Sequence, residues 1–328
     1  MGSPHRSPTA TVERHALDEP TGVSGWAGLL AGHPRDPAFS IDFIRALGEG
    51  FGLTPHLYLA RQDGAPAAGA LLLERRKGPF RAAVVPSFVS YTPWLGGPHD
   101  EAAVHRREAL DECLLSALER DFDQARIHLP PSVGDVRPFQ WRGWRISTFY
   151  TYQIPLAAGV DPIGGWSESA RRRFASARAG YRFHDTVTAS QVLTLSRASY
   201  ARQGRPFPVD ADALIGIIET LQQKGLARLF GVEQPGAEPA AAVALLHAPD
   251  RSYYWIAGST PGDAMTVLLG HLLPALRDEG VSVFDFVGAN TPSIAEFKRR
   301  FGGILTPYYT AERIAHPVLK ALALLKRR

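Results

Sequence analysis

The stretch FDFVGANTPSIAEFKRRFGG, residues Phe284–Gly303, joins a strand pattern to a helix pattern and carries one charge on the inward side of each. Successive side chains of a strand point to opposite faces, so over Val281–Val287 Asp285 lies on the same face as Val281, Val283 and Val287. The next element shows helical spacing of its inward residues, Ile294, Phe297, Lys298 and Phe301. Because a buried charge is costly unless it is paired, Asp285 and Lys298 are the first candidates for function.

Local signals predict where this helix begins and ends. Ser293 followed three residues later by Glu296 has the capping-box pattern, and Gly302 supplies a C-terminal stop. We therefore expect a helix over Ile294–Phe301 with Lys298 on its inner stripe. The lysine either pairs with Asp285 or extends from the helix edge, or it faces a cleft and stabilises negative charge on a substrate.

The loop between strand and helix, GANTP, follows the carboxyl end of the strand. Ligands bind at this edge in open α/β sheets, which makes Asn290 a candidate site residue. The alternative is a turn residue that bonds its own backbone.

An internal repeat organises the chain. Leu57–Leu73 (LYLARQDGAPAAGALLL) resembles Phe230–Leu246 (FGVEQPGAEPAAAVALL), and each reads as a hairpin. A strand, a Thr-Pro loop, a long helix and another strand follow both hairpins in the same order. Phe139–Tyr150 then matches Phe297–Tyr308. The sequence predicts an α/β (α+β) fold of two tandem domains, each a mixed twisted sheet flanked by helices.

The domain boundary is expected in the loop-like stretch LAAGVDP. We expect a mobile N-terminal arm over residues 1–20, a first domain over 21–158 and a second over 159–328 that ends in a C-terminal helix. Only the second copy has both charges, since Lys298 aligns with Gln140. This asymmetry indicates chemistry in the second domain and an acceptor or scaffold role for the first.

Composition excludes several classes. The 328 residues, 45% of them hydrophobic, suffice for two cores. No run approaches the roughly 20 apolar residues of a membrane span, and the polar N-terminus lacks the apolar region of a signal peptide. The single cysteine, Cys113, excludes an internal disulfide, and a cytoplasmic location is the simplest expectation. No metal site is expected, because the histidines form neither HExxH nor HxH.

Basic residues cluster in the stretch WSESARRRFASARAGYRF, from Trp166 to Phe183, which is predicted to form a helix. The pI of the whole chain is about 9.3. Phosphate or RNA-backbone contact and simple solvation both explain this pattern. In the first half, YTPWLGGP could line an acceptor pocket with Tyr91 and Trp94, although a tryptophan there could equally be buried.

This order of elements, ending in an FDF strand and an FKRRFGG helix, resembles the tandem acyltransferase fold of the Fem-type transferases, the amide-forming branch of the GNAT superfamily. The resemblance is best over Trp166–Tyr309, and SIAEFKRRFGG is its most specific part. A Phe-Lys pair before Phe-Gly marks, in that family, a lysine near the reacting ends of donor and acceptor. The resemblance therefore implies that role for Phe297 and Lys298.

The resemblance also bears on the donor. Acyl-CoA enzymes of the superfamily hold pyrophosphate with an [RQ]xxGx[GA] loop at a helix N-terminus. Here the loop is STPGDAMTV, which has one glycine, and Asp263 would repel pyrophosphate. Aminoacyl-tRNA is therefore the expected donor and partner, with no cofactor. The expected donor-binding residues are Arg171, Arg172, Arg173, Arg178, Arg299 and Arg300, and the expected acceptor-binding residues are Tyr91, Trp94 and Tyr254.

The expected function is transfer of an aminoacyl group from tRNA to the amine of a small-molecule or peptide acceptor. Lys298 would stabilise the oxyanion or the tRNA 3′ end, Asp285 would orient it or help remove the amine proton, and Phe297 would pack on the terminal nucleotide. The alternatives are an N-acyltransferase that uses acyl-CoA, and a non-catalytic domain pair that binds polyanions or a partner.

Overall fold

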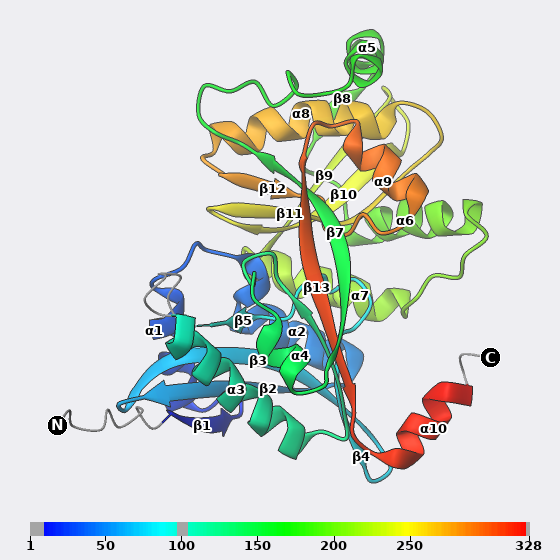
Figure 1. Ribbon diagram of the computed structural model, residues 1–328. Helices are drawn as coiled ribbons and strands as arrows, with labels where there is room; N and C mark the ends of the chain where they lie inside the picture. The colour runs from blue at the N-terminus through cyan, green and yellow to red at the C-terminus, as the bar shows by residue number, and fades with distance from the viewer. Residues whose placement is uncertain (1–9, 97–103, 326–328) are drawn as a thin grey trace, which may run out of the picture. The chain divides into compact units, whose positions relative to one another are not determined.

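The computed structural model describes residues 10–96 and 104–325 (Figure 1). The chain divides into two compact units, and each unit is built from segments far apart in the sequence. Unit 1 takes the chain up to His33, Gly52–Thr148 and the chain from Tyr308 onward, and unit 2 takes Pro34–Phe51 and Phe149–Pro307. Each unit is a mixed sheet flanked by helices, so the predicted fold class is confirmed.

In unit 1 the strands follow the order β1-β2-β3-β4-β6-β13, with β5 beside β3. The strands are β1 (Ala10–His15), β2 (Thr54–Gln62), β3 (Ala65–Lys77), β4 (Phe80–Val84), β5 (Trp94–Leu95), β6 (Gln124–Leu129) and the Tyr308–Ile314 part of β13 (Ile304–Ile314). The helices are α1 (Pro20–Leu30), α3 (Val104–Asp121), α4 (Arg137–Trp141) and α10 (Pro317–Leu325). Within this sheet, β4 and β6 run parallel.

The core of unit 1 is built on the inward stripe of α3. Leu110, Leu114 and Leu118 on this helix are buried against β2, where Tyr58 and Ala60 point the same way. Helical spacing of the leucines and strand alternation on β2 therefore meet in one apolar layer.

Unit 2 has the strand order β7-β12-β11-β10-β9-β8. Its strands are β7 (Arg145–Pro155, from Phe149 onward), β8 (Arg182–His184), β9 (Ala227–Glu233), β10 (Pro239–Ala248), β11 (Arg251–Ser259) and β12 (Val283–Asp285). Its helices are the 3-10 turns η1 (Pro37–Phe39) and η3 (Arg178–Gly180), and α2 (Ile41–Phe51), α5 (Glu168–Ala177), α6 (Ala189–Arg202), α7 (Ala211–Gln223), α8 (Ala264–Asp278) and α9 (Pro292–Arg299). Strands β11 and β12 run parallel.

Helices cover both faces of the unit 2 sheet. Figure 1 shows α8 and α6 on opposite sides of β9–β11. Alternation on β11 explains this arrangement, because Ala257 packs in the cluster that contains the leucines of α8, while Gly258 lies against the backbone of α6. The glycine lets strand and helix approach closely.

Two sequence expectations about chain organisation need correction. The arm expected over residues 1–20 is not mobile throughout: Ala10–His15 form β1, which pairs with β2 because Ala10 and Val12 pack on the unit 1 core. Residues 1–9 lie outside the described part of the chain. The units are also discontinuous, unlike the continuous ranges 21–158 and 159–328. Helix α2 packs on α7 in unit 2, and β13 pairs with β6 in unit 1.

We predict that Gly258→Ala lowers the free energy of unfolding by about 1–3 kcal/mol, since the added methyl group would overlap the backbone of Leu195 and Ser196. Urea unfolding measures the change. The matched control is Gly216→Ala in α7, where the methyl group meets nothing within 4 Å and should stabilise the helix by about 0.5–1 kcal/mol. Equal stability of wild type and Gly258→Ala would contradict the close packing of β11 on α6.

Candidate active site

The candidate site lies where β12 leaves the sheet of unit 2. The parallel register of β11 and β12 ends at Tyr253 and Asp285, although β11 continues to Ser259. Beyond Asp285 the chain turns through Val287 (φ 42°) and Gly288 (φ 78°). Positive φ is rare for a β-branched residue, so surrounding contacts must hold Val287 in place.

Lys298 of α9 holds this turn. Its Nζ donates to the carbonyl oxygens of Phe286, Val287 and Gly288 at 2.6, 3.0 and 2.5 Å. An ammonium group has three donors, so these bonds use all of them. The side chain is only 6% exposed, which confirms that Lys298 lies on the inner stripe.

Burial strongly perturbs this lysine. Desolvation lowers the pKa of Lys298 from its ordinary 10.5 to about 7, while the charge of Asp285 opposes the shift. Aromatic faces complete its surroundings: Nζ lies 5.8 Å from the ring centre of Tyr254 and 5.9 Å from that of Phe286. At neutral pH the amino group therefore exists in both protonation states.

Asp285 is fully buried and accepts hydrogen bonds from three sides. Thr151 Oγ1 and the backbone N–H of Val287 donate to Oδ1 at 2.6 and 2.8 Å, and Gln153 Nε2 donates to Oδ2 at 2.8 Å. Arg251 forms an ion pair with Oδ2 at 3.8 Å. The carboxylate thus ties β12 to β7 and fixes the turn, and it acts on Lys298 through its charge.

The other predicted residues of this region take different positions. Phe297 is half-buried, with its ring 5.0 Å from that of Phe301. Asn290 is exposed, and its Oδ1 accepts from the backbone N–H of Tyr150 at 2.7 Å. The hydroxyl of Tyr254 donates to Met265 Sδ at 3.2 Å, and burial raises its pKa. The structure therefore brings Lys298, Asp285 and Tyr254 together.

The helix start differs from the sequence expectation. Thr291 is the N-cap of α9, Pro292 occupies the first turn, and no side chain caps the helix. The expected capping box of Ser293 and Glu296 is therefore wrong. Proline fixes the first turn without needing an N–H partner, so it sets the start two residues earlier than Ile294.

The predicted acceptor residues of the first half are both in unit 1. Tyr91 and Trp94 are each 1% exposed, and Trp94 lies on β5. The ring of Tyr91 meets that of Tyr308 edge-on at 5.3 Å. Their part in binding an acceptor stays a prediction.

The predicted donor arginines lie on α5, η3, α9 and the C-cap of α9, and most have partners within unit 2. Arg171 donates to the carbonyl oxygen of Gly164, Arg172 pairs with Glu168, Arg173 with Asp263, and Arg300 with Glu296; Arg178 stacks on Phe174. Arg299 is exposed, with no partner among the described residues. Donor binding by these residues stays a prediction.

The loop before α8 has an acidic N-cap. Asp263 occupies this position, and its carboxylate pairs with Arg173 at 3.3 Å. Its side chain makes no cap hydrogen bond, but the carboxylate puts a negative charge beside the helix N-terminus, where this charge opposes the binding of an anionic ligand.

Sequence reasoning missed Thr151, Gln153 and Arg251 around Asp285. The first two are polar residues at alternate positions of an otherwise apolar strand end, TYQIP, and this spacing could have identified them as partners of a buried acid.

Metal and membrane features are absent from the described residues. No group of three or more His, Cys, Asp or Glu side chains in residues 10–96 and 104–325 is arranged to hold a metal ion. Within the same ranges, none of the helices has the length and apolarity that crossing a bilayer requires.

Comparisons with known proteins agree on the fold. Residues 167–299 match the family model of an acetyltransferase (GNAT) domain. Among solved structures, FemX is similar with a TM-score of 0.68 and 13% identity, covering 90% of this chain and 96% of that one. A tandem GNAT protein from the clavulanic acid biosynthesis pathway gives 0.57 and 14%, covering 94% and 99%. L-PGS from Bacillus licheniformis gives 0.55 and 13%, covering 94% and 96%.

No curated protein matches the sequence. The chain has a Fem-like tandem GNAT fold, which confirms the resemblance inferred from its sequence.

The lowered pKa of Lys298 predicts a pH-dependent stability. Between pH about 7 and 10.5 the unfolded chain binds more protons at this lysine than the native state does. The lysine therefore destabilises the fold most below pH 7, and this destabilisation is gone above pH 10.5. The unfolding free energy of wild type relative to Lys298→Met should therefore rise through this window, by up to about 1.4 kcal/mol per pH unit.

Urea unfolding of both proteins at several pH values measures this difference. Lys224→Met, which removes an exposed lysine, corrects for the general effect of losing one positive charge. A constant difference across the window would show that Lys298 keeps its ordinary proton affinity.

Proposed function

We propose that this protein is an acyltransferase that forms an amide bond by moving an aminoacyl group from aminoacyl-tRNA to the amine of a small-molecule or peptide acceptor. The observation that carries the proposal is the buried amino group of Lys298, placed where parallel strands β11 and β12 stop pairing. The GNAT match over residues 167–299 supports acyl transfer as the reaction class.

The reaction needs one group that both stabilises negative charge on the oxyanion and transfers protons. The acceptor nitrogen attacks the ester carbonyl, a C–N bond forms, the C–O bond to the ribose breaks, and a proton passes from nitrogen to the ribose oxygen. An amino group with a pKa of about 7 can donate a proton to the leaving oxygen and accept one from the amine. Its cationic form also stabilises the oxyanion.

The three carbonyl contacts give Lys298 its position before substrate arrives. In the reaction, one of its N–H groups turns from a carbonyl oxygen to the substrate oxygen. Asp285 is a positioning residue in this scheme, since it fixes the turn that supplies those carbonyl groups. In this scheme Tyr254, whose ring centre lies 5.8 Å from Nζ, contacts the acceptor.

The start of α8 favours a donor without pyrophosphate. Asp263 is the N-cap residue of this helix, and its carboxylate pairs with Arg173. A CoA pyrophosphate bound to the backbone N–H groups there would lie beside this carboxylate, and the two negative charges would repel each other. The exposed Arg299 and the neighbouring arginines of α5 instead provide positive charge for a polynucleotide backbone.

Acyl-CoA remains the second candidate donor, because the matching family model describes an acetyltransferase domain. One assay separates the two. The protein is incubated with charged tRNA or acetyl-CoA and a panel of amines, and new amides are detected by mass spectrometry. We expect product that depends on charged tRNA and disappears after RNase treatment; CoA release with acetylated amines would overturn the tRNA assignment.

With the productive amine, Lys298→Met should lower turnover by about 100-fold or more, since it removes the proton-transferring group while keeping a long side chain. Wild-type turnover should also depend on pH around 7, the pKa of this lysine. The control is Arg75→Ala, an exposed residue of β3 in unit 1. Unchanged turnover in folded Lys298→Met would remove the lysine from the mechanism.

Salt dependence tests the polynucleotide contact directly. The affinity for tRNA should fall with salt, and Arg299→Ala should reduce the slope of log K against log salt concentration by about 1 if its side chain meets one phosphate. Filter binding at several ionic strengths measures the slope. Arg75→Ala is again the control, and equal slopes for Arg299→Ala and wild type would place Arg299 outside the interface.

A further inference from the structure

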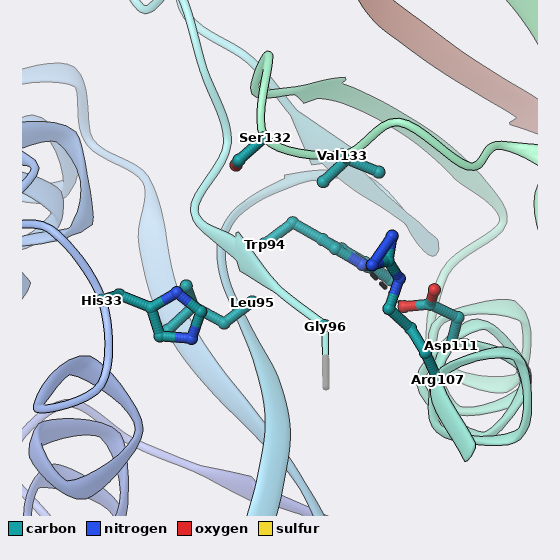
Figure 2. Close-up of a pocket in the computed structure, with 8 residues that line it drawn as sticks. All are labelled: His33, Trp94, Leu95, Gly96, Arg107, Asp111, Ser132 and Val133. Carbon is teal, nitrogen blue, oxygen red and sulfur yellow. Dashed lines mark hydrogen bonds between the residues drawn. The ribbon is translucent and has the colours of Figure 1, made fainter. Parts of the chain in front are cut away.

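Unit 2 has a groove on the exposed face of helix α6 that the proposed reaction does not use. Its volume is about 470 Å³, within the roughly 300–1,000 Å³ typical of small-molecule sites. Figure 2 shows a pocket of unit 1 between Trp94 of β5 and Asp111 of α3, whose volume is only about 20 Å³. That is room for one water-sized group, so the groove on α6 is the better candidate for a ligand.

One side of the groove is a stripe of α6. Val192 and Ser196 of this helix are buried, because this side of α6 packs on β10 and β11. The other side contributes four exposed residues with the spacing i, i+3, i+4 and i+7, namely Thr194, Arg197, Ala198 and Ala201. The short alanine side chains leave the space that the longer side chains border.

The chain after α6 folds back to form the second side of the groove. Gly204 adopts φ 66°, and its N–H donates to the carbonyl oxygen of Ala201 at 2.9 Å. The N–H of Arg205 donates to the carbonyl oxygen of Tyr200 at 3.0 Å. The ring of Phe207 then meets that of Tyr200 edge-on at 5.2 Å. These contacts hold the loop beside the helix, so the groove is formed before a ligand binds.

Two arginines give the groove its charge. The guanidinium group of Arg205 lies over the ring of Tyr200, 5.5 Å from its centre, which holds the group in place and leaves its N–H edges open. Neither Arg197 nor Arg205 forms an ion pair or a side-chain hydrogen bond with a residue that the structure describes. Arg202 of the same helix, by contrast, donates to the carbonyl oxygen of Ser259. None of the described residues that line the groove is acidic, so it carries two positive charges and no negative one.

These charges select the kind of anion. A guanidinium group binds phosphate oxygen atoms with paired N–H donors. At neutral pH a phosphate monoester carries a charge of about −1.5 to −2, which two arginines balance, whereas a carboxylate carries a single charge. The rest of the lining is mainly apolar, with two alanines, Pro206 and the half-buried Phe207. It therefore favours a ligand whose organic part is apolar.

We propose that this groove binds a phosphate monoester with an apolar organic part. Arg197 and Arg205 hold the phosphate group, and the organic part lies on the alanines of α6 and on Phe207. The groove is separate from the proposed donor contact on the arginines of α5. Helix α5 packs on α8, and α8 and α6 cover opposite sides of the sheet (Figure 1).

Isothermal titration calorimetry of the full chain with phenyl phosphate at low ionic strength tests the proposal. We expect saturable binding with a dissociation constant on the order of 0.1 mM. Inorganic phosphate should bind about tenfold more weakly, because it has the charge but no apolar part, and phenol should not bind saturably, because it has no charge. Absence of saturable phenyl phosphate binding would overturn the proposal, and so would an equal affinity for either control compound.

Two variants locate the site. Arg197→Gln and Arg205→Gln should each weaken phenyl phosphate binding at least about tenfold, since each removes a charged donor. The control is Arg75→Gln, which removes an exposed arginine of unit 1 and should bind as the wild type does. Wild-type affinity in either folded groove variant would show that the phosphate binds elsewhere.

A competition experiment distinguishes a small phosphate monoester from a polynucleotide backbone. Phenyl phosphate should keep its affinity in the presence of saturating tRNA, because the donor contact lies on the other side of the sheet. Displacement by tRNA would identify the groove as a polynucleotide contact and contradict the proposal. Neither result decides the amide-forming assay, which reads the site at Lys298.

Discussion

Three backbone carbonyl groups that leave the sheet after β12 are satisfied by a single buried ammonium group. A buried carbonyl without a partner is costly, and so is a buried cation without acceptors. Lys298 and the turn over Phe286–Gly288 remove both costs at once. The contact holds Val287 at positive φ, docks α9 on the end of β12, and keeps the amino group beside the point where β11 and β12 stop pairing.

The same contact links stability to chemistry. The carbonyl groups hold the ammonium in place, while desolvation brings its pKa to about 7. Asp285 keeps the turn rigid through Thr151, Gln153 and the N–H of Val287, and its charge limits the fall in the pKa of Lys298. Asp285 and Lys298 thus act on each other across the turn over Phe286–Gly288. The hydrogen bonds of Lys298 go to the backbone carbonyl oxygen atoms of this turn.

Periodicity was sufficient to predict several of these features. The i, i+3, i+4, i+7 stripe placed Lys298 inward, and the repeat gave two mixed α/β units. Other features depend on contacts distant in sequence: α2 packs on α7, and β13 pairs with β6, so neither unit is a continuous segment.

The proposed chemistry requires that the amino group of Lys298 change protonation near neutral pH. The direct measurement is an NMR titration of its side chain with ¹³C-labelled lysine, assigned by loss of one signal in Lys298→Met. We expect the ¹³Cε signal of Lys298 to titrate with a midpoint near pH 7, well below the 10.5 of an ordinary lysine. A midpoint above pH 10 would contradict it, because the buried amino group would then be a permanent cation with only a structural role.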